Sequence, residues 1–218
     1  MKNRENRKWD KFVMSELRGQ TVGFVGFGSI AQTTARLCRA FGMKVLALRR
    51  RVDSPGSELA DKVYSMKDKL KVFQESDFVV CSLPGTCSVV DDVRDINVNW
   101  NIQTGTSETL KFCGEEEFKS MKDSSVFVSI GRGTCVDEDA LCTALKTKSI
   151  SGAALDVFFK EPLDQSSALW DCDNILITAH NADFTKGYME DTWEVFLKNF
   201  ECYREGKSFP TVSLKLGY

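Results

Sequence analysis

Residues 20–31 read QTVGFVGFGSIA, and this stretch decides the fold. Gln20–Phe27 has the pattern of a short apolar strand that ends in glycine. Ser29–Phe41 carries apolar residues at helical spacing, and Gly42 stops that helix. Lys44–Leu48 follows as a second apolar strand. A strand, a glycine turn, a helix and a second strand within about 30 residues predict a βαβ unit.

The same alternation continues toward the C-terminus. Helical patterns occur around residues 65–75, at EEEFKSM, at 137–147 and at 189–204, and apolar strand patterns occur at 78–83, 125–130, 153–158 and 174–178. Strands that alternate with helices predict an α/β fold with a doubly wound parallel sheet of the Rossmann type. Residues 89–106 have no helical period, and we expect a long surface loop there.

Composition and charge narrow the class of protein. The chain has 218 residues, 42% of them hydrophobic, a net charge of −2 and a sequence pI of about 5.6. This balance gives no sign of a nucleic-acid partner or of an anionic membrane surface. The polar N-terminus has no apolar segment of a secretory signal, and no stretch is long and apolar enough to span a membrane.

The cysteines indicate a reducing compartment, and we expect a cytoplasmic protein. The eight cysteines form no CxxC pair, and the chain has a single histidine, so we expect no metal site. Most of the cysteines lie in apolar runs such as FVVCSL, where buried free thiols are expected.

The segment from Gly26 to Ala31 matches the pattern G-x-G-x-x-A. Gly26 permits a tight turn out of the strand, Gly28 lets the backbone approach a pyrophosphate, and Ala31 lets the helix pack close to the strand. The helix that starts at Ser29 and Ile30 offers free N–H groups to phosphates. Between a strand and a helix the pattern predicts a dinucleotide site. The alternative is a glycine-rich turn without a ligand.

The second predicted strand ends in Arg49, Arg50 and Arg51. An acidic residue at this position binds the ribose 2′-hydroxyl of NAD, whereas guanidinium groups suit the 2′-phosphate of NADP. We therefore expect NADP as the preferred cofactor, with NAD possible. The alternative is a solvated basic run on the surface.

Three later segments each follow a predicted strand and carry Arg132, Glu161 and His180. Ligands of an open α/β sheet bind at the carboxyl ends of its strands, so these side chains can converge. Reduction of a 2-keto acid needs a cation for the carboxylate, as Arg132 offers, and a proton donor, as the imidazole of His180 offers. Glu161 would orient that imidazole and favour its protonated form. Each residue taken alone could instead be structural.

These segments together are similar to a known family. GFGSIA, FKSMKDSSVFVSIGRGTCVDEDAL, GAALDVFFKEPL and SALWDCDNILITAHNA resemble the D-isomer-specific 2-hydroxyacid dehydrogenases, over roughly 190 residues. The resemblance implies that Arg132 holds the substrate and that Glu161 and His180 form an acid/base pair. It also implies that Asp156 faces the nicotinamide carboxamide and that Leu83 and Pro84 form part of the cofactor wall. The cofactor residues that we expect also include Ile130, Gly131 and Ala182.

The chain departs from the family pattern in two places, and these departures define the expected domain boundaries. Family members carry a substrate domain before the cofactor domain, and here the resemblance begins in the connecting helix. We expect a helix remnant at residues 1–17, the NAD(P)-binding domain at 18–186, and at 187–218 a helix and tail that belong with the absent domain. Residues 87–106 separate CSLPGT from SETLKF, and we interpret them as an insertion.

The sequence therefore predicts an NAD(P)-dependent oxidoreductase that reduces a small 2-keto acid, such as hydroxypyruvate or glyoxylate, to the D-2-hydroxy acid. The small-molecule partner would be this keto acid. The protein partner would be a second copy of the chain in a homodimer, or another chain that supplies the substrate domain. One alternative is a catalytically impaired NAD(P)-binding interaction module, since the C-terminal-binding protein corepressors resemble the same dehydrogenases. A truncated product is the other. On any of these interpretations the apolar face of the last helix lacks its usual partner, and we expect it to be exposed or to be covered in a dimer.

Overall fold

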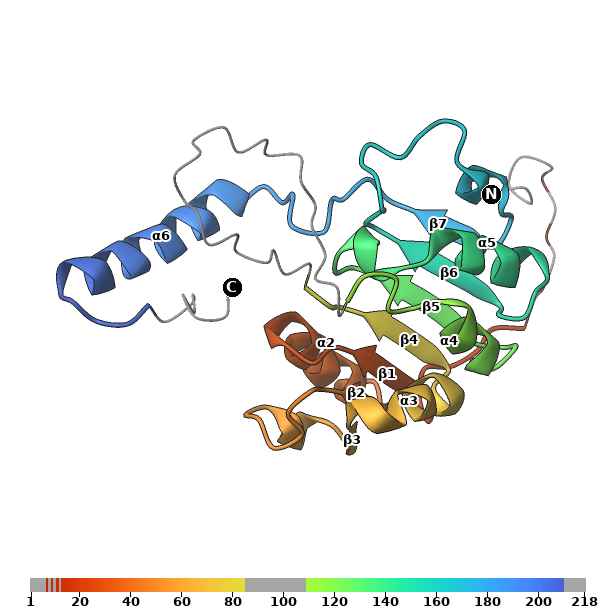
Figure 1. The fold of residues 1–218 in the computed structure, drawn as a ribbon, viewed down its shortest axis with the longest axis horizontal. Coiled ribbons are helices and arrows are strands. Elements are labelled where there is room, and N and C mark those ends of the chain that lie inside the picture. The colour runs from red at the N-terminus through yellow and green to blue at the C-terminus, as the bar shows by residue number, and fades with distance from the viewer. Residues whose placement is uncertain (1–6, 8, 10, 12, 85–108, 210–218) are drawn as a thin grey trace.

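A parallel sheet forms the centre of the molecule in a computed structural model that describes residues 7, 9, 11, 13–84 and 109–209. The strands are β1 Thr21–Val25, β2 Lys44–Leu48, β3 Lys62–Tyr64, β4 Phe78–Cys81, β5 Val126–Ser129, β6 Gly152–Leu155 and β7 Ile175–Ile177. Their order is β3-β2-β1-β4-β5-β6-β7, and every neighbouring pair is parallel. The chain reverses its direction of travel across the sheet between β1 and β4, so the doubly wound prediction is confirmed (Figure 1).

Helices cover both faces of this sheet, because alternate side chains of each buried strand point to opposite faces. The helices that pack on the sheet are α2 Ser29–Ala40, α3 Lys69–Glu75, α4 Glu115–Ser120 and α5 Glu138–Lys146, whereas α6 Tyr188–Arg204 extends away from it (Figure 1). On one face Ala31 and Ala35 of α2 pack in a cluster with Phe24. On the other face Phe73 of α3 and Phe118 of α4 share a second cluster with the strands.

The second cluster contains an aromatic pair that joins α4 to the sheet. The rings of Phe118 and Phe127 meet edge to face, with centroids 5.1 Å apart, and both side chains are buried. Truncation of a buried phenylalanine to alanine costs about 3–5 kcal/mol. This packing fixes β5, whose carboxyl end leads directly to the segment that carries Arg132.

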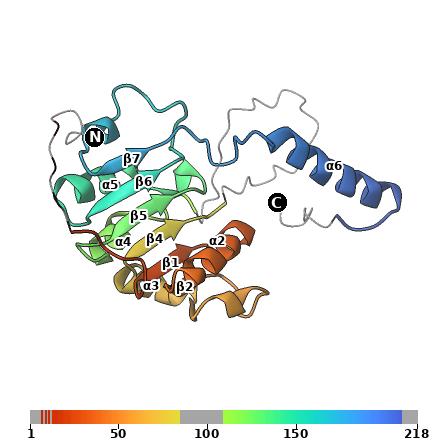
Figure 2. The same ribbon diagram turned by 180° about the vertical axis from the view of Figure 1, so that it is seen from behind.

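The carboxyl ends of the strands face the side of the molecule from which α6 departs (Figures 1 and 2). No residue of α6 is buried, and its aromatic side chains Trp193, Phe196 and Phe200 are each about half exposed. This face is therefore exposed in the single chain, and a dimer that covers it stays a prediction. The outer strand is also open on one face, since Leu176 of β7 is 63% exposed. No helix in the described ranges has the length and apolarity needed to cross a bilayer.

Three details differ from the sequence-based expectations. Residues 13–16, which end the expected helix remnant 1–17, form neither helix nor strand, so the helical prediction is wrong for these residues. The edge strand β3 was not predicted. The helix expected around residues 65–75 begins with a 3₁₀ turn at Met66–Asp68 before α3. The expected loop at 89–106, and the insertion 87–106 with it, lie outside the described residues.

Candidate active site

The turn after β1 has the conformation that the glycine pattern predicts. Gly26 has a φ of +85°, which residues with a side chain rarely adopt. A Cβ atom there would lie 3.0 Å from a methyl carbon of Leu83. The Ser82 hydroxyl donates a hydrogen bond to the Gly26 carbonyl at 3.1 Å, which ties the turn to the chain after β4. The turn therefore lies at the point where the strand order reverses.

The start of α2 is open toward solvent and suits an anion. Gly28 is the N-cap, no side chain caps the helix, and the first turn has no acidic residue. Ser29 and Ile30 are exposed, and a Cβ atom on Gly28 would meet nothing within 4 Å. Uncapped N–H groups at the positive end of a twelve-residue helix, with open space in front of Gly28, fit the pyrophosphate of a dinucleotide.

The segments after β4 and β5 lie against each other and form a wall beside this turn. A Cβ atom on Gly131 would come within 2.4 Å of the Leu83 carbonyl oxygen, so only glycine permits this approach. Ile130 is half-buried and its amide donates to the Cys81 carbonyl, while Pro84 is exposed. Leu83, Pro84, Ile130 and Gly131, all expected to contact the cofactor, are thus brought together at one edge.

The three arginines after β2 have different surroundings. Arg49 is half-buried, and its Nη1 donates to the carbonyls of Ser54 and Pro55 and to the Ser57 hydroxyl at 2.9–3.1 Å. Its guanidinium carbon also lies 5.9 Å from the centre of the Phe27 ring. Arg50 and Arg51 are exposed. Arg49 therefore helps to hold the loop that follows β2.

Glu161 and His180 form a close pair. Nδ1 of His180 lies 2.7 Å from Oε2 of Glu161. The other carboxylate oxygen, Oε1, accepts from the Phe158 amide at 2.9 Å, so the glutamate is fixed by its own loop. A carboxylate only accepts hydrogen bonds, so Nδ1 carries the proton in this contact. The His180 side chain is 40% exposed, whereas that of Glu161 is 19% exposed.

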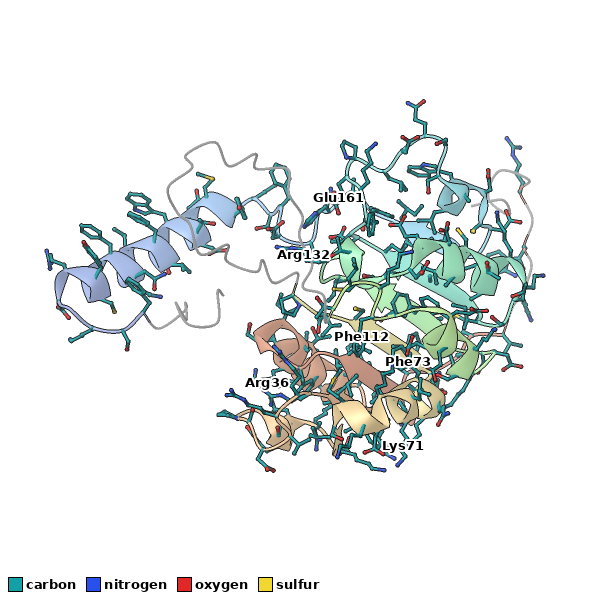
Figure 3. All side chains as sticks on the ribbon, in the orientation of Figure 1. Arg36, Lys71, Phe73, Phe112, Arg132 and Glu161 are labelled. Carbon is teal, nitrogen blue, oxygen red and sulfur yellow. The ribbon has the colours of Figure 1, made fainter. Side chains whose placement is uncertain are left out.

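Arg132 follows Gly131 at the same end of the sheet. Its side chain is exposed, and its Nη1 donates to the Gly131 carbonyl at 3.0 Å. In Figure 3 both Arg132 and Glu161 lie on the side of the sheet from which α6 departs. An exposed guanidinium at the same end of the sheet as a carboxylate–imidazole pair can bind the carboxylate of a small acid, while the imidazole exchanges a proton with the carbonyl oxygen of that acid.

Asp156 supports the segment that carries His180. The side chain is 8% exposed. Its Oδ1 accepts from the Thr178 hydroxyl at 2.5 Å and from the Asn181 amide at 2.9 Å, and its Oδ2 accepts from the Ala182 amide at 3.0 Å. Burial alone would raise the pKa of Asp156. These hydrogen bonds and the attraction of His180 outweigh burial and hold the pKa below its ordinary value.

Two residues in the surroundings of the pair were not predicted. Thr178 contacts Asp156, as described above. Glu138, in the first turn of α5, accepts from the Phe159 amide at 2.6 Å and so supports the loop that carries Glu161. Burial raises the pKa of Glu138. In the sequence Glu138 is one of several acids that open a helix, and nothing in that pattern separates it from Asp137 or Asp139.

The fold and the glycine turn define this chain as a dinucleotide-binding α/β domain. The profile described as D-isomer specific 2-hydroxyacid dehydrogenase, NAD binding domain, matches residues 1–91 and 98–182. The chain therefore belongs to this family, as the sequence predicted. The match skips residues 92–97, which fall within the expected insertion 87–106, and it does not cover residues 183–218.

Relatives that are named as reductases support the same family. A glyoxylate reductase of Thermococcus gammatolerans is 34% identical over 202 residues, which cover 92% of this chain and 53% of that protein. A probable 2-ketogluconate reductase of Dictyostelium discoideum is 36% identical over 166 residues, 76% of this chain and 43% of that protein. The structure of a D-isomer specific 2-hydroxyacid dehydrogenase family protein from Aeromonas salmonicida superposes with a TM-score of 0.78 at 29% identity, covering 96% of this chain and 60% of that chain. The chain thus spans about half the length of the curated relatives it matches.

Proposed function

We propose that this chain is the cofactor-binding half of an oxidoreductase that reduces a small 2-keto acid, of the hydroxypyruvate or glyoxylate type, to the D-2-hydroxy acid. The observation that carries the proposal is the 2.7 Å contact between His180 and Glu161 at the same sheet edge as the Gly26 turn. A proton donor beside a dinucleotide site is what carbonyl reduction requires.

Each residue has a separate task in this reaction. Arg132 binds the carboxylate and polarises the adjacent carbonyl of the keto acid. Glu161 holds Nδ1 of His180, so Nε2 is the ring nitrogen that gives its proton to the oxygen of the reacting carbonyl. The reduced nicotinamide supplies the hydride when it is bound. His180 is regenerated when it takes up a proton from water, because Glu161 then stabilises the charged imidazole.

We propose that the cofactor sits on the turn formed by Gly26, Gly28, Ser29 and Ile30. Leu83, Pro84, Ile130 and Gly131 would form its wall, and Asp156 and Ala182 would lie next to the nicotinamide end. NADP is the proposed preference, with NAD as the alternative, because Arg49, Arg50 and Arg51 stand where NAD-specific sites carry an acid. Arg50 and Arg51, which are exposed, suit the 2′-phosphate better than Arg49, whose donors hold the loop at residues 54–57.

The domain organisation and the partner are part of the proposal. Residues 18–186 would be the cofactor domain, and residues 1–17 and 187–218 would belong with a substrate domain. The exposed aromatic face of α6 supports a further surface that covers it, from a substrate domain or from a homodimer. A cytoplasmic location is supported by the seven described cysteines, which are all free, five of them buried as predicted.

The first experiment is a titration of the purified chain with NADPH, followed by nicotinamide fluorescence, and then the addition of hydroxypyruvate or glyoxylate. We expect binding, and oxidation of NADPH wherever the substrate surface is complete. Arg132→Lys should bind NADPH as the parent does but lose turnover, because an ammonium cannot form the bidentate contact. A chain that binds no nicotinamide dinucleotide would contradict the proposal.

One observation, the exposure of α6, favours a second function. A half-site with a large unpartnered apolar face also fits an NAD(P)-binding interaction module without turnover. Binding of NADPH without oxidation, together with a stable protein partner whose release depends on substitutions in α6, would favour the module. Oxidation of NADPH that is lost in His180→Gln would favour the enzyme.

A further inference from the structure

We propose that Asp156 is a positioning residue, which holds His180 in the orientation that its pairing with Glu161 requires. The observation is a cluster of hydrogen bonds in which one nearly buried carboxylate binds the residues on both sides of the histidine. The inference rests on the proposed function for the catalytic task of His180. Its test, however, reads the imidazole directly and needs neither cofactor nor substrate.

The backbone at His180 needs such support. His180 has a φ of +53°, in the left-handed region, where a side chain costs roughly 1 kcal/mol or more. Its amide donates to the Asp156 carbonyl at 2.8 Å, so the turn contacts Asp156 through main chain as well as side chain. A turn in this conformation persists where its surroundings hold it, and Asp156 supplies those surroundings from the end of β6.

The donors surround the histidine in sequence. The Thr178 hydroxyl lies two residues before His180, and the Asn181 and Ala182 amides follow it directly. Charged acceptors form hydrogen bonds about twice as strong as neutral ones. A rotation of the turn that moved the imidazole away from Glu161 would break these bonds. The carboxylate of Asp156 therefore fixes the backbone that carries the ring, while Glu161 fixes the ring at Nδ1.

The carboxylates of Glu161 and Asp156 have different roles in this arrangement. Glu161 touches the imidazole itself, whereas Asp156 contacts the turn and leaves the imidazole contact to Glu161. Two of the acceptor positions of Asp156 are used by main-chain amides that no substitution of a side chain can remove. The side chain of Thr178 is the one donor that can be changed without touching the backbone.

The test uses the fact that His180 is the only histidine of the chain. In long-range ¹H–¹⁵N correlation spectra of the full chain its two ring nitrogens give an unambiguous signature. We expect the wild type to show the tautomer with the proton on Nδ1, in contact with Glu161. In Asp156→Asn the chemical shifts of the two ring nitrogens should move toward those of an imidazole that exchanges freely between its tautomers. Hydrogen exchange at the Asn181 and Ala182 amides should accelerate roughly tenfold or more.

Substitutions of Thr178 test the same proposal if Asp156→Asn does not fold. Thr178→Val should move the imidazole signature part of the way, and Thr178→Ser, which keeps the hydroxyl, should restore it. Asp77→Asn is a matched control, because Asp77 also accepts from a main-chain amide, that of Thr21, and pairs with Lys122 at 2.7 Å at the opposite edge of the sheet. That variant should leave the imidazole unchanged.

The inference is wrong if the Asn181 and Ala182 amides lose protection in Asp156→Asn while the ring of His180 keeps its wild-type tautomer. It is also wrong if Thr178→Val and Thr178→Ser give the same spectrum as the wild type. The proposed function can fail separately. If the wild type never oxidises NADPH but Asp156→Asn still releases the imidazole, the positioning role stands and the reductase assignment does not.

Discussion

Gly28 and Gly131 flank the proposed cofactor edge, but a side chain would meet different surroundings at each. A Cβ atom on Gly28 meets nothing within 4 Å, whereas one on Gly131 comes within 2.4 Å of the Leu83 carbonyl. We predict that Gly28→Ala changes the free energy of unfolding by less than about 0.5 kcal/mol. The same variant should weaken NADPH binding by about tenfold, because the methyl group occupies the space of the pyrophosphate.

Gly131→Ala is the matched comparison for this prediction. Its methyl group must displace backbone, which we expect to cost about 1–3 kcal/mol of unfolding free energy in urea titrations. Gly28→Ala with unchanged NADPH affinity, measured by fluorescence titration, would show that the dinucleotide does not approach the chain at this turn.

Arg49 and Arg51 allow the cofactor preference to be separated from the stability of the loop. Arg51→Gln should lower the affinity for NADPH relative to NADH by about tenfold, because one charge-assisted contact to the 2′-phosphate is lost. Arg49→Gln should instead lower the melting temperature, since Arg49 donates to Ser54, Pro55 and Ser57. Parallel titrations with both nucleotides measure the ratio. Equal ratios in the wild type and Arg51→Gln would remove Arg51 from the site.

The site residues could be predicted mainly from their positions just after the ends of strands. Arg132, Glu161 and His180 could be predicted to converge because each follows a strand of a parallel sheet, and the Glu161–His180 contact is confirmed. The hydrogen bonds that Asp156 accepts could not be predicted, because they depend on the three-dimensional turn at residues 178–182. The left-handed φ at His180 could not be predicted either, since even the non-glycine residues enriched at positive φ, histidine among them, adopt it only in a minority of cases.

At the scale of elements, α5 is anchored by a residue that responds to pH. Asp137 is its N-cap, accepting from the Ala140 amide at 3.2 Å, and Lys111 lies 3.1 Å from its other oxygen. Burial would raise the pKa of Asp137, but the hydrogen bonds from Lys111 and Ala140 lower it below its ordinary value of 3.8. We predict that Asp137→Ala costs about 1 kcal/mol of unfolding free energy near neutral pH.

This cost should disappear in acid. A carboxyl group whose pKa is lower in the folded state stabilises that state above its ordinary pKa, and the benefit is lost as the pH falls through the lower folded value. Urea titrations of the wild type and Asp137→Ala should therefore differ at about pH 7 and converge as the pH falls through the lowered pKa of Asp137. Asp137→Asn is the control, because asparagine also caps helices but carries no charge. A difference that stays constant across this range would contradict the assignment.

The elements that the sequence did not predict are those that lack a periodic pattern. β3 has three residues, Lys62–Tyr64, which is too short to show alternation, and it is stabilised by pairing with Leu46–Leu48. Residues 13–16 were expected to be helical because the family resemblance begins in a connecting helix, but they form no helix in the structure. Val13 is 99% exposed, so no packing stabilises a helix there.

At the scale of the whole molecule, the doubly wound parallel sheet followed from the sequence while the position of α6 did not. Each crossover in a parallel sheet is constrained in hand and must cover apolar strands, so the alternating pattern defined the sheet. The spacing of Trp193, Phe196 and Phe200 predicted an apolar helix face but could not say what it packs against. In the structure these rings stack on one another, with centroids 5.2 Å and 6.1 Å apart.

This exposed face gives the last prediction. Because no residue of α6 is buried, Phe196→Asp should leave the melting temperature of the sheet domain unchanged within about 2 °C. It should, however, reduce self-association in sedimentation experiments and lower the fluorescence of a dye that binds apolar surface. Lys198→Gln, on the opposite side of the helix by its spacing, is the matched control and should change neither quantity. If Phe196→Asp instead unfolds the domain, α6 packs against the sheet in solution, and the surface that we assign to a partner is part of the core.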